Sequence, residues 1–121
     1  MSFVDPQVIS SLSSLDRGKA DALPHGAIKV DDSGTIQLYN RWESQLAGVP
    51  PAAAEGKNFF TQIAPCTNNR LVFGRFKDSV ASGSLDFEIK YTFTYKMKPT
   101  NVTLRLVKDP STKANWVFVK N

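Results

Sequence analysis

Apolar and polar residues alternate most regularly between residues 85 and 97. The residues between the apolar ones are charged or carry hydroxyl groups, and the apolar ones are Leu85, Phe87, Ile89, Tyr91, Phe93, Tyr95 and Met97. Because successive side chains of a strand point to opposite faces, this two-residue period predicts one long strand with a buried and a solvated face. Pro99 ends the strand.

Shorter apolar runs predict four more strands. Residues 27–30 and 35–39 are joined by Asp31-Asp32-Ser33-Gly34, which has the composition of a hairpin turn. Residues 101–107 and 116–119 are joined by a second turn that begins at Asp109-Pro110. We therefore expect five strands in one mostly antiparallel sheet.

Helical spacing lies between the two groups of strands. Gly48 and Gly83 should end helices over 40–46 and 71–82, since glycine readily adopts the left-handed conformation that follows a helix. Another turn fits residues 52–55, and Asn58 is placed to cap a short segment over 59–63. Strands, helices and then strands around a single sheet predict an α+β fold.

The first 24 residues form a separate pattern. A narrow apolar stripe at Val8, Ile9, Leu12 and Leu15 is surrounded by serines, and Pro24 closes the segment. We expect residues 1–24 to form a helical cap that docks weakly on a core of residues 25–121. The length of 121 residues predicts one domain in total.

Composition and charge narrow the classes of function. No apolar run approaches the roughly 18 residues of a membrane span, and the N-terminus lacks the pattern of a secretion signal, so a cytoplasmic protein is expected. The net charge is +4, and the lysine and arginine residues are scattered along the chain and form no basic run. Neither a membrane nor a nucleic acid is therefore expected as a partner.

Cys66 is the only cysteine, so the chain can form no internal disulfide and no zinc site of several thiolates. Its thiol is either a small buried apolar group or a reactive one. A thiol enzyme would need a nearby base, and the single histidine, His25, directly follows Pro24 without an oxyanion-hole motif. We expect His25 on the surface and no enzyme.

Several motifs give a sharper indication when they are taken together. Gly56-Lys57-Asn58-Phe59-Phe60 and Ala64-Pro65-Cys66-Thr67, with Gln37-Leu38-Tyr39-Asn40 before them and Trp116-Val117-Phe118-Val119-Lys120 after them, resemble the photoactive yellow protein family. The resemblance runs from about residue 26 to residue 120. It implies the PAS fold, a five-stranded antiparallel sheet flanked by short helices and one longer helix, with an N-terminal helical cap.

The resemblance also implies a function and a site. Members of the family are blue-light photoreceptors that carry trans-p-coumaric acid as a thioester, here on Cys66. Tyr39 and Glu43 would hydrogen-bond the phenolic oxygen of this chromophore, and the Cys66 backbone amide its carbonyl oxygen. The remaining pocket residues would be Phe59, Pro65, Phe93, Tyr95 and Met97, of which Met97 would assist the thermal return to the trans form.

The chemistry of these residues suits the role. Tyr39 and Glu43 are four residues apart and share a face if helical geometry holds between them, so that both can donate to one oxygen. Glu43 can donate only when protonated, which burial and a neighbouring negative charge both favour. After isomerisation, Glu43 would give its proton to the phenolate, and the buried carboxylate left behind would loosen the cap.

Two positions depart from the family pattern. Ala47 and Val49 stand where the family often has a threonine and an arginine, so the tuning that those residues provide cannot be carried over. A PAS ligand-binding or interaction module that uses no chromophore is the alternative. In either case we expect an unidentified downstream signalling partner and a monomer or weak dimer.

Overall fold

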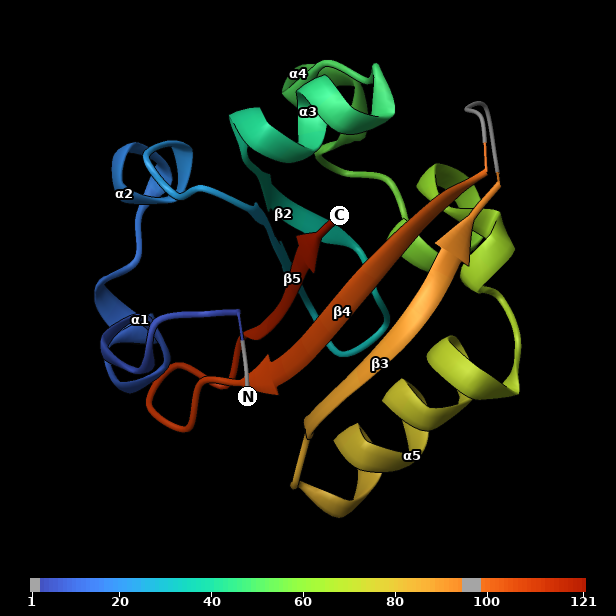
Figure 1. Ribbon diagram of the computed structural model, residues 1–121. Helices are drawn as coiled ribbons and strands as arrows, with labels where there is room; N and C mark the ends of the chain where they lie inside the picture. The colour runs from blue at the N-terminus through green and yellow to red at the C-terminus, as the bar shows by residue number, and fades with distance from the viewer. Residues whose placement is uncertain (1–2, 95–98) are drawn as a thin grey trace.

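The computed structural model describes residues 3–94 and 99–121, and within them the chain forms one five-stranded antiparallel sheet (Figure 1). The strand order is β2-β1-β5-β4-β3. The strands are β1 (Gly26–Val30), β2 (Ile36–Tyr39), β3 (Asp86–Phe93), β4 (Thr100–Lys108) and β5 (Asn115–Lys120). The sequence prediction of a five-stranded antiparallel sheet is confirmed.

The register of the sheet follows from the alternation of apolar residues. β3 pairs with β4 from Asp86↔Val107 to Phe93↔Thr100, and β1 pairs with β5 from Gly26↔Val119 to Val30↔Asn115. β1 and β5 are therefore interior strands, although they are far apart in the chain. The predicted positions of Tyr95 and Met97 lie outside the described residues.

Short helical elements fill the connections. The N-terminal segment contains α1 (Pro6–Ser10), a 3-10 turn η1 (Leu12–Ser14) and α2 (Arg17–Asp21). Between β2 and β3 lie α3 (Arg41–Ala47), α4 (Pro51–Ala54), η2 (Phe59–Ile63), η3 (Pro65–Thr67), η4 (Arg70–Gly74) and α5 (Arg75–Ser82). No helix among the described residues is long and apolar enough to cross a bilayer.

Both faces of the sheet are covered, and β5 shows this best because its side chains are buried on both sides. Val117 and Val119 belong to the larger core, which β3, β4 and the helices between β2 and β3 complete. Trp116 and Phe118 belong to a second cluster with residues of the N-terminal segment, including Leu12. In Figure 1 the N-terminal segment, in blue, lies well apart from α5, in yellow.

Two details differ from the sequence prediction. The single helix expected over 71–82 is a π-helical turn, η4, that continues into α5, and Leu71 is 60% exposed instead of packing on the core. The surface position expected for His25 was wrong. Its ring is only 3% exposed because it packs edge-on between Phe3 and Phe118.

Candidate functional site

A narrow slot lies between α3, the loop around Cys66 and β3. Its empty volume is about 280 Å³, most of which is too narrow for a water molecule. The lining is apolar except for a phenol, a carboxyl and a thiol. The lining residues are Tyr39, Glu43, Ala47, Phe59, Ile63, Ala64, Cys66 and Phe93.

Tyr39 and Glu43 form one end of this slot, which we call the phenol end. Tyr39 is the last residue of β2 and Glu43 lies in the first turn of α3. Helical geometry does not extend to Tyr39, because Asn40 between them has an extended backbone (φ −80°, ψ 172°). The two side chains meet because the strand ends where the helix begins, so the condition of a shared helical face was wrong.

Asn40 fixes this junction and is completely buried. Its Oδ1 accepts from the backbone N–H of Glu43 (3.1 Å) and of Ala27 (3.0 Å). Its Nδ2 donates to the backbone carbonyls of Ala20 (2.8 Å) and His25 (3.0 Å). One side chain thus caps α3 and ties that helix to β1 and to the N-terminal segment.

Two polar atoms at the phenol end have no hydrogen-bond partner within the described residues. They are the hydroxyl oxygen of Tyr39 and Oε1 of Glu43, both buried. Buried polar groups are nearly always paired, and an unpaired one costs about 1–3 kcal/mol. Two orphaned groups that line the same slot therefore indicate a place for a polar atom of a ligand.

Burial also sets the protonation of these groups. Desolvation raises the pKa of Glu43 to about 8, so the carboxyl is neutral near pH 7 and can donate a hydrogen bond. Desolvation, with a smaller contribution from the nearby Glu43, raises the pKa of Tyr39 well above its ordinary value. The phenol end therefore holds two neutral O–H donors.

Gly26 of β1 lies directly against the Glu43 side chain. A Cβ atom at this position would collide with Glu43 Oε1 and would come within 3.1 Å of the Val119 Cβ. Only glycine leaves room for the carboxyl to lie flat on the sheet. Glycine at position 26 is therefore a packing requirement of the site.

Cys66 also lines the slot, and we call its part of the lining the thiol end. It sits in η3 after Pro65 and is half-buried. Its carbonyl oxygen accepts from the hydroxyl of Tyr91 on β3 and from Nδ2 of Asn69 (3.1 Å). The backbone that carries the thiol is therefore held against the sheet.

The other residues that the sequence pointed to have different positions. Phe59 and Phe93 line the slot, whereas Pro65 is not among the lining residues. Ala47 lines it and Val49 packs against the same core. Ile63 and Ala64 also line the slot. The sequence reasoning did not select them, although both directly precede the Pro65-Cys66 pair.

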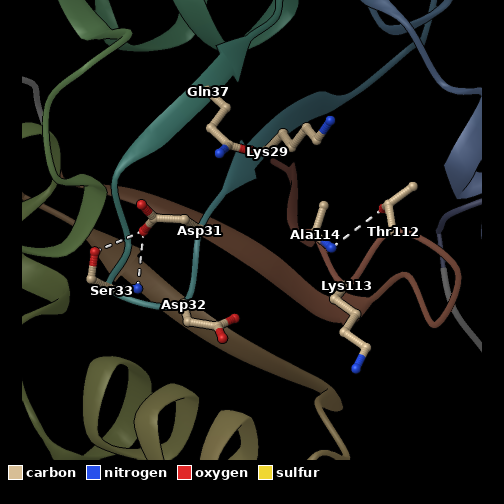
Figure 2. Close-up of a pocket in the computed structure, with 8 residues that line it drawn as sticks. All are labelled: Lys29, Asp31, Asp32, Ser33, Gln37, Thr112, Lys113 and Ala114. Atoms are coloured by element: carbon tan, nitrogen blue, oxygen red, sulfur yellow. Dashed lines mark hydrogen bonds between the residues drawn. The ribbon is translucent and has the colours of Figure 1, made fainter.

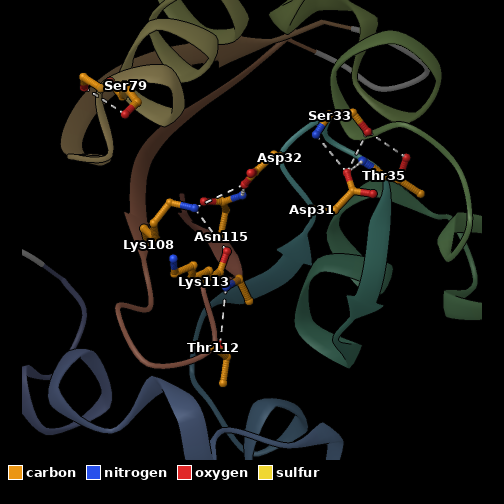
Figure 3. Close-up of polar contacts among 11 residues, drawn as sticks. Asp31, Asp32, Ser33, Thr35, Ser79, Lys108, Thr112, Lys113 and Asn115 are labelled. Carbon is orange, nitrogen blue, oxygen red and sulfur yellow. Dashed lines mark hydrogen bonds and ion pairs between the residues drawn. The ribbon is translucent and has the colours of Figure 1, made fainter.

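A wider recess between the two hairpin turns has different chemistry. It has an empty volume of about 860 Å³ that opens to solvent, and Figure 2 shows polar side chains around it. Asp31 accepts from the backbone and hydroxyl of Ser33, while Asp32 accepts from Lys108 Nζ (3.2 Å) and Asn115 Nδ2 (2.9 Å) (Figure 3). These carboxylates hold the turns together through their hydrogen bonds.

Comparison with known proteins decides the family. No family model matches the chain. The photoactive yellow protein of Rhodothalassium salexigens is 37% identical over 118 residues, which are 98% of this chain and 94% of that protein. The chain belongs to the photoactive yellow protein family. A second member, from Halochromatium salexigens, is 38% identical over the same shares of each chain.

Solved structures agree with this assignment. The photoactive yellow protein domain of the sensor histidine kinase Ppr from Rhodospirillum centenum has a TM-score of 0.86 at 42% identity, covering 95% of this chain and 98% of that domain. The PAS domain of the quorum-sensing receptor RpfR from Cronobacter turicensis has a TM-score of 0.67 at 16% identity, covering 82% and 94%. The second likeness shows the PAS fold alone.

Proposed function

We propose that this protein is a blue-light photoreceptor that carries p-coumaric acid as a thioester on Cys66. The observation that carries the proposal is that the buried hydroxyl of Tyr39 and a buried carboxyl oxygen of Glu43, neither with a hydrogen-bond partner within the described residues, line the same apolar slot as Cys66. When bound, such a group supplies a double bond that light isomerises and a phenolate that absorbs visible light. Membership of the photoactive yellow protein family supports this assignment.

Cys66 would attach the group by acyl transfer. Its thiolate sulfur forms a bond to the carbonyl carbon of an activated p-coumaric acid, the activating group leaves with the bonding electron pair, and the thiol proton passes to solvent. His25 is not placed to assist, because it packs with Phe3 and Phe118 on the face of the sheet away from the slot. We therefore assign Cys66 an attachment role and no turnover.

Tyr39 and Glu43 would bind the phenolate oxygen. A buried anion is stable only when donors surround it, and the two orphaned O–H groups meet that need. The slot is narrow, so Ile63, Ala64 and Phe93 must move apart slightly to admit a planar acyl group. Ala47 brings only a methyl group to the slot and adds no donor.

Glu43 would also carry the signal. In the dark its raised pKa keeps the proton that it shares with the phenolate. After isomerisation Glu43 would pass this proton to the phenolate oxygen, and a carboxylate would remain buried against Gly26. A buried unpaired charge is costly, so the first turn of α3 rearranges.

The N-terminal segment would respond because polar contacts tie it to α3. Asp21 of α2 accepts from the backbone N–H of Arg41 (2.7 Å), and Ala20 accepts from Asn40. A shift of α3 breaks these contacts, loosens the cap and exposes Trp116 and Phe118. The likeness to a domain of a sensor histidine kinase supports a signalling protein as the partner for this surface.

Reconstitution tests the proposal. The apoprotein is mixed with p-coumaric anhydride, and the expected product has the mass of one added p-coumaroyl group and a visible band that bleaches in blue light and recovers in the dark. Cys66→Ala should form neither. Tyr39→Phe serves as the matched control, because it should keep the added mass but shift the band.

Two results would overturn the proposal. One is a folded wild-type protein that stays colourless, which would favour a PAS ligand-binding module that uses no chromophore. The other is a Cys66→Ala variant with the same band as the wild type.

A further inference from the structure

We propose that Asn69 and Tyr91 are positioning residues that clamp the Cys66 carbonyl to β3 and so hold the thiol in the slot. The inference rests on the proposed function where it concerns the photocycle, but the clamp itself is a property of the apoprotein. It begins from Asn69, which follows the attachment loop and precedes η4.

The side-chain amide of Asn69 uses its whole hydrogen-bonding capacity. Oδ1 accepts from the backbone N–H of Leu71 (3.0 Å) and of Val72 (3.1 Å). Nδ2 donates to the Cys66 carbonyl (3.1 Å) and to the Tyr91 hydroxyl (2.7 Å). An amide offers two donors and two acceptor lone pairs, so four bonds leave no freedom to rotate.

Tyr91 closes a three-membered ring of hydrogen bonds. Its hydroxyl accepts from Asn69 and donates to the Cys66 carbonyl, which Asn69 also contacts. The ring joins the attachment loop, the start of η4 and the interior of β3. Because β3 pairs with β4 at Tyr91↔Val102, the carbonyl is anchored to the sheet itself.

The clamp acts on the backbone carbonyl of the residue that carries the thiol. Fixing the Cys66 carbonyl fixes the orientation of its peptide plane, and Pro65 restricts the backbone on the other side. The Cα–Cβ bond of Cys66 then has a defined direction toward the slot. The thiol end is fixed, and a displacement that starts there must be taken up at the phenol end.

Three variants separate the clamp from its structural neighbours. Asn69→Asp keeps both acceptors for Leu71 and Val72 but loses the donors to the clamp. Tyr91→Phe removes only the hydroxyl. Asn68→Ala is the control, because Asn68 is also an exposed asparagine, one position earlier, and its side chain has no hydrogen bond within the described residues.

The first measurement uses the apoprotein and an aromatic disulfide reagent. The Cys66 thiolate attacks the disulfide, forms a mixed disulfide and releases a coloured aromatic thiolate, so the rate reports how freely the thiol leaves the slot. We expect Asn69→Asp and Tyr91→Phe to react about three to ten times faster than the wild type, the factor that corresponds to one lost hydrogen bond. Asn68→Ala should react at the wild-type rate.

The second measurement uses the pigmented protein after a blue flash. With the clamp released, the attached end can relax, so less strain drives the return, and dark recovery should slow about three- to tenfold in the same two variants. Equal thiol reactivity in all four proteins would refute the clamp whatever the pigment does. A wild type that takes no pigment would instead refute the proposed function and leave the thiol measurement decisive for the clamp.

Discussion

The phenol end and the thiol end of the slot are each organised by one asparagine, and the two asparagines work in opposite surroundings. Asn40 and Asn69 both make four side-chain hydrogen bonds. Asn40 is fully buried and joins α3 to β1 and the cap, whereas Asn69 is exposed and joins the attachment loop to β3. Loss of the Asn40 side chain should therefore lower the stability of the fold, whereas loss of the Asn69 side chain should change the position of the Cys66 thiol.

The difference in burial explains these two expectations, because water can replace a lost hydrogen-bond partner only at the surface. A group that loses its partner at Asn40 stays buried and unsatisfied, while the Cys66 carbonyl near Asn69 has solvent within reach. At the phenol end the backbone is better satisfied than the side chains that line the slot. Asn40 holds the backbone there, but Tyr39 and Glu43 each have a buried polar atom with no hydrogen-bond partner within the described residues.

The largest effect is expected from Asn40→Ala. It leaves two N–H groups and two carbonyls of the buried junction without their partner, so we expect the free energy of unfolding to fall by about 3 kcal/mol or more. Urea unfolding at pH 7 measures the change. Asn69→Ala is the comparison, because replacing this exposed residue should lower the free energy of unfolding by only about 1 kcal/mol. Equal losses in the two variants would contradict the difference between the two asparagines.

Gly26→Ala should have the next largest effect. The added methyl group overlaps the Glu43 carboxyl and crowds Val119, and such overpacking costs about 1–3 kcal/mol. Gly18→Ala is the control, because a Cβ there meets only Asp16 Oδ1 at an ordinary 3.6 Å. Thermal unfolding of both variants tests this; a Gly26→Ala protein as stable as Gly18→Ala would show that the carboxyl does not lie against β1.

Glu43→Gln should change how the stability of the apoprotein depends on pH. The folded-state pKa of Glu43 is raised from 4.5 to about 8, so between these values the unfolded state loses a proton that the folded state keeps. The stabilisation is complete below pH 4.5 and is lost as pH rises to about 8. Urea titrations from pH 5 to 8 should show a decline in the wild type that is shallower in Glu43→Gln.

The smallest effect is expected at His25, on the far face of the sheet. Desolvation between Phe3 and Phe118 lowers the pKa of this histidine below 6.5, while its hydrogen bond to the Gly26 carbonyl opposes the shift. The unfolded state then binds a proton first, so stability is lost as pH falls through the lowered pKa. His25→Phe should unfold at a temperature that changes less between pH 7 and pH 5, and identical changes in both proteins would argue against a buried neutral imidazole.

Local patterns predicted the framework of this protein well. The alternation in β3, the left-handed glycines Gly48 and Gly83 after their helices, and the Asn58 cap of η2 all depend on neighbours within a few residues. The hydrophobic period contains that information directly. The family motifs then selected Tyr39, Glu43 and Cys66, which line one slot.

Contacts between segments that are distant in the chain could not be predicted from the sequence. His25 looked exposed because its neighbours are a proline and a glycine, and only Phe3 and Phe118 bury it. The clamp on Cys66 was equally hidden, since Asn69 and Tyr91 are separated by η4 and α5 and meet only in the fold. Asparagine is common at turns and helix caps, and nothing in a local pattern shows which asparagine will also form hydrogen bonds with distant elements.

The place of β5 in the sheet also orders the assembly of the molecule during synthesis. β1 supports Glu43 through Gly26, but Gly26 pairs with Val119, so this edge of the slot lacks its neighbour until the last strand leaves the ribosome. Such long-range pairing forms late in folding. A slot with all of its supporting strands in place therefore exists only after β5 has paired with β1.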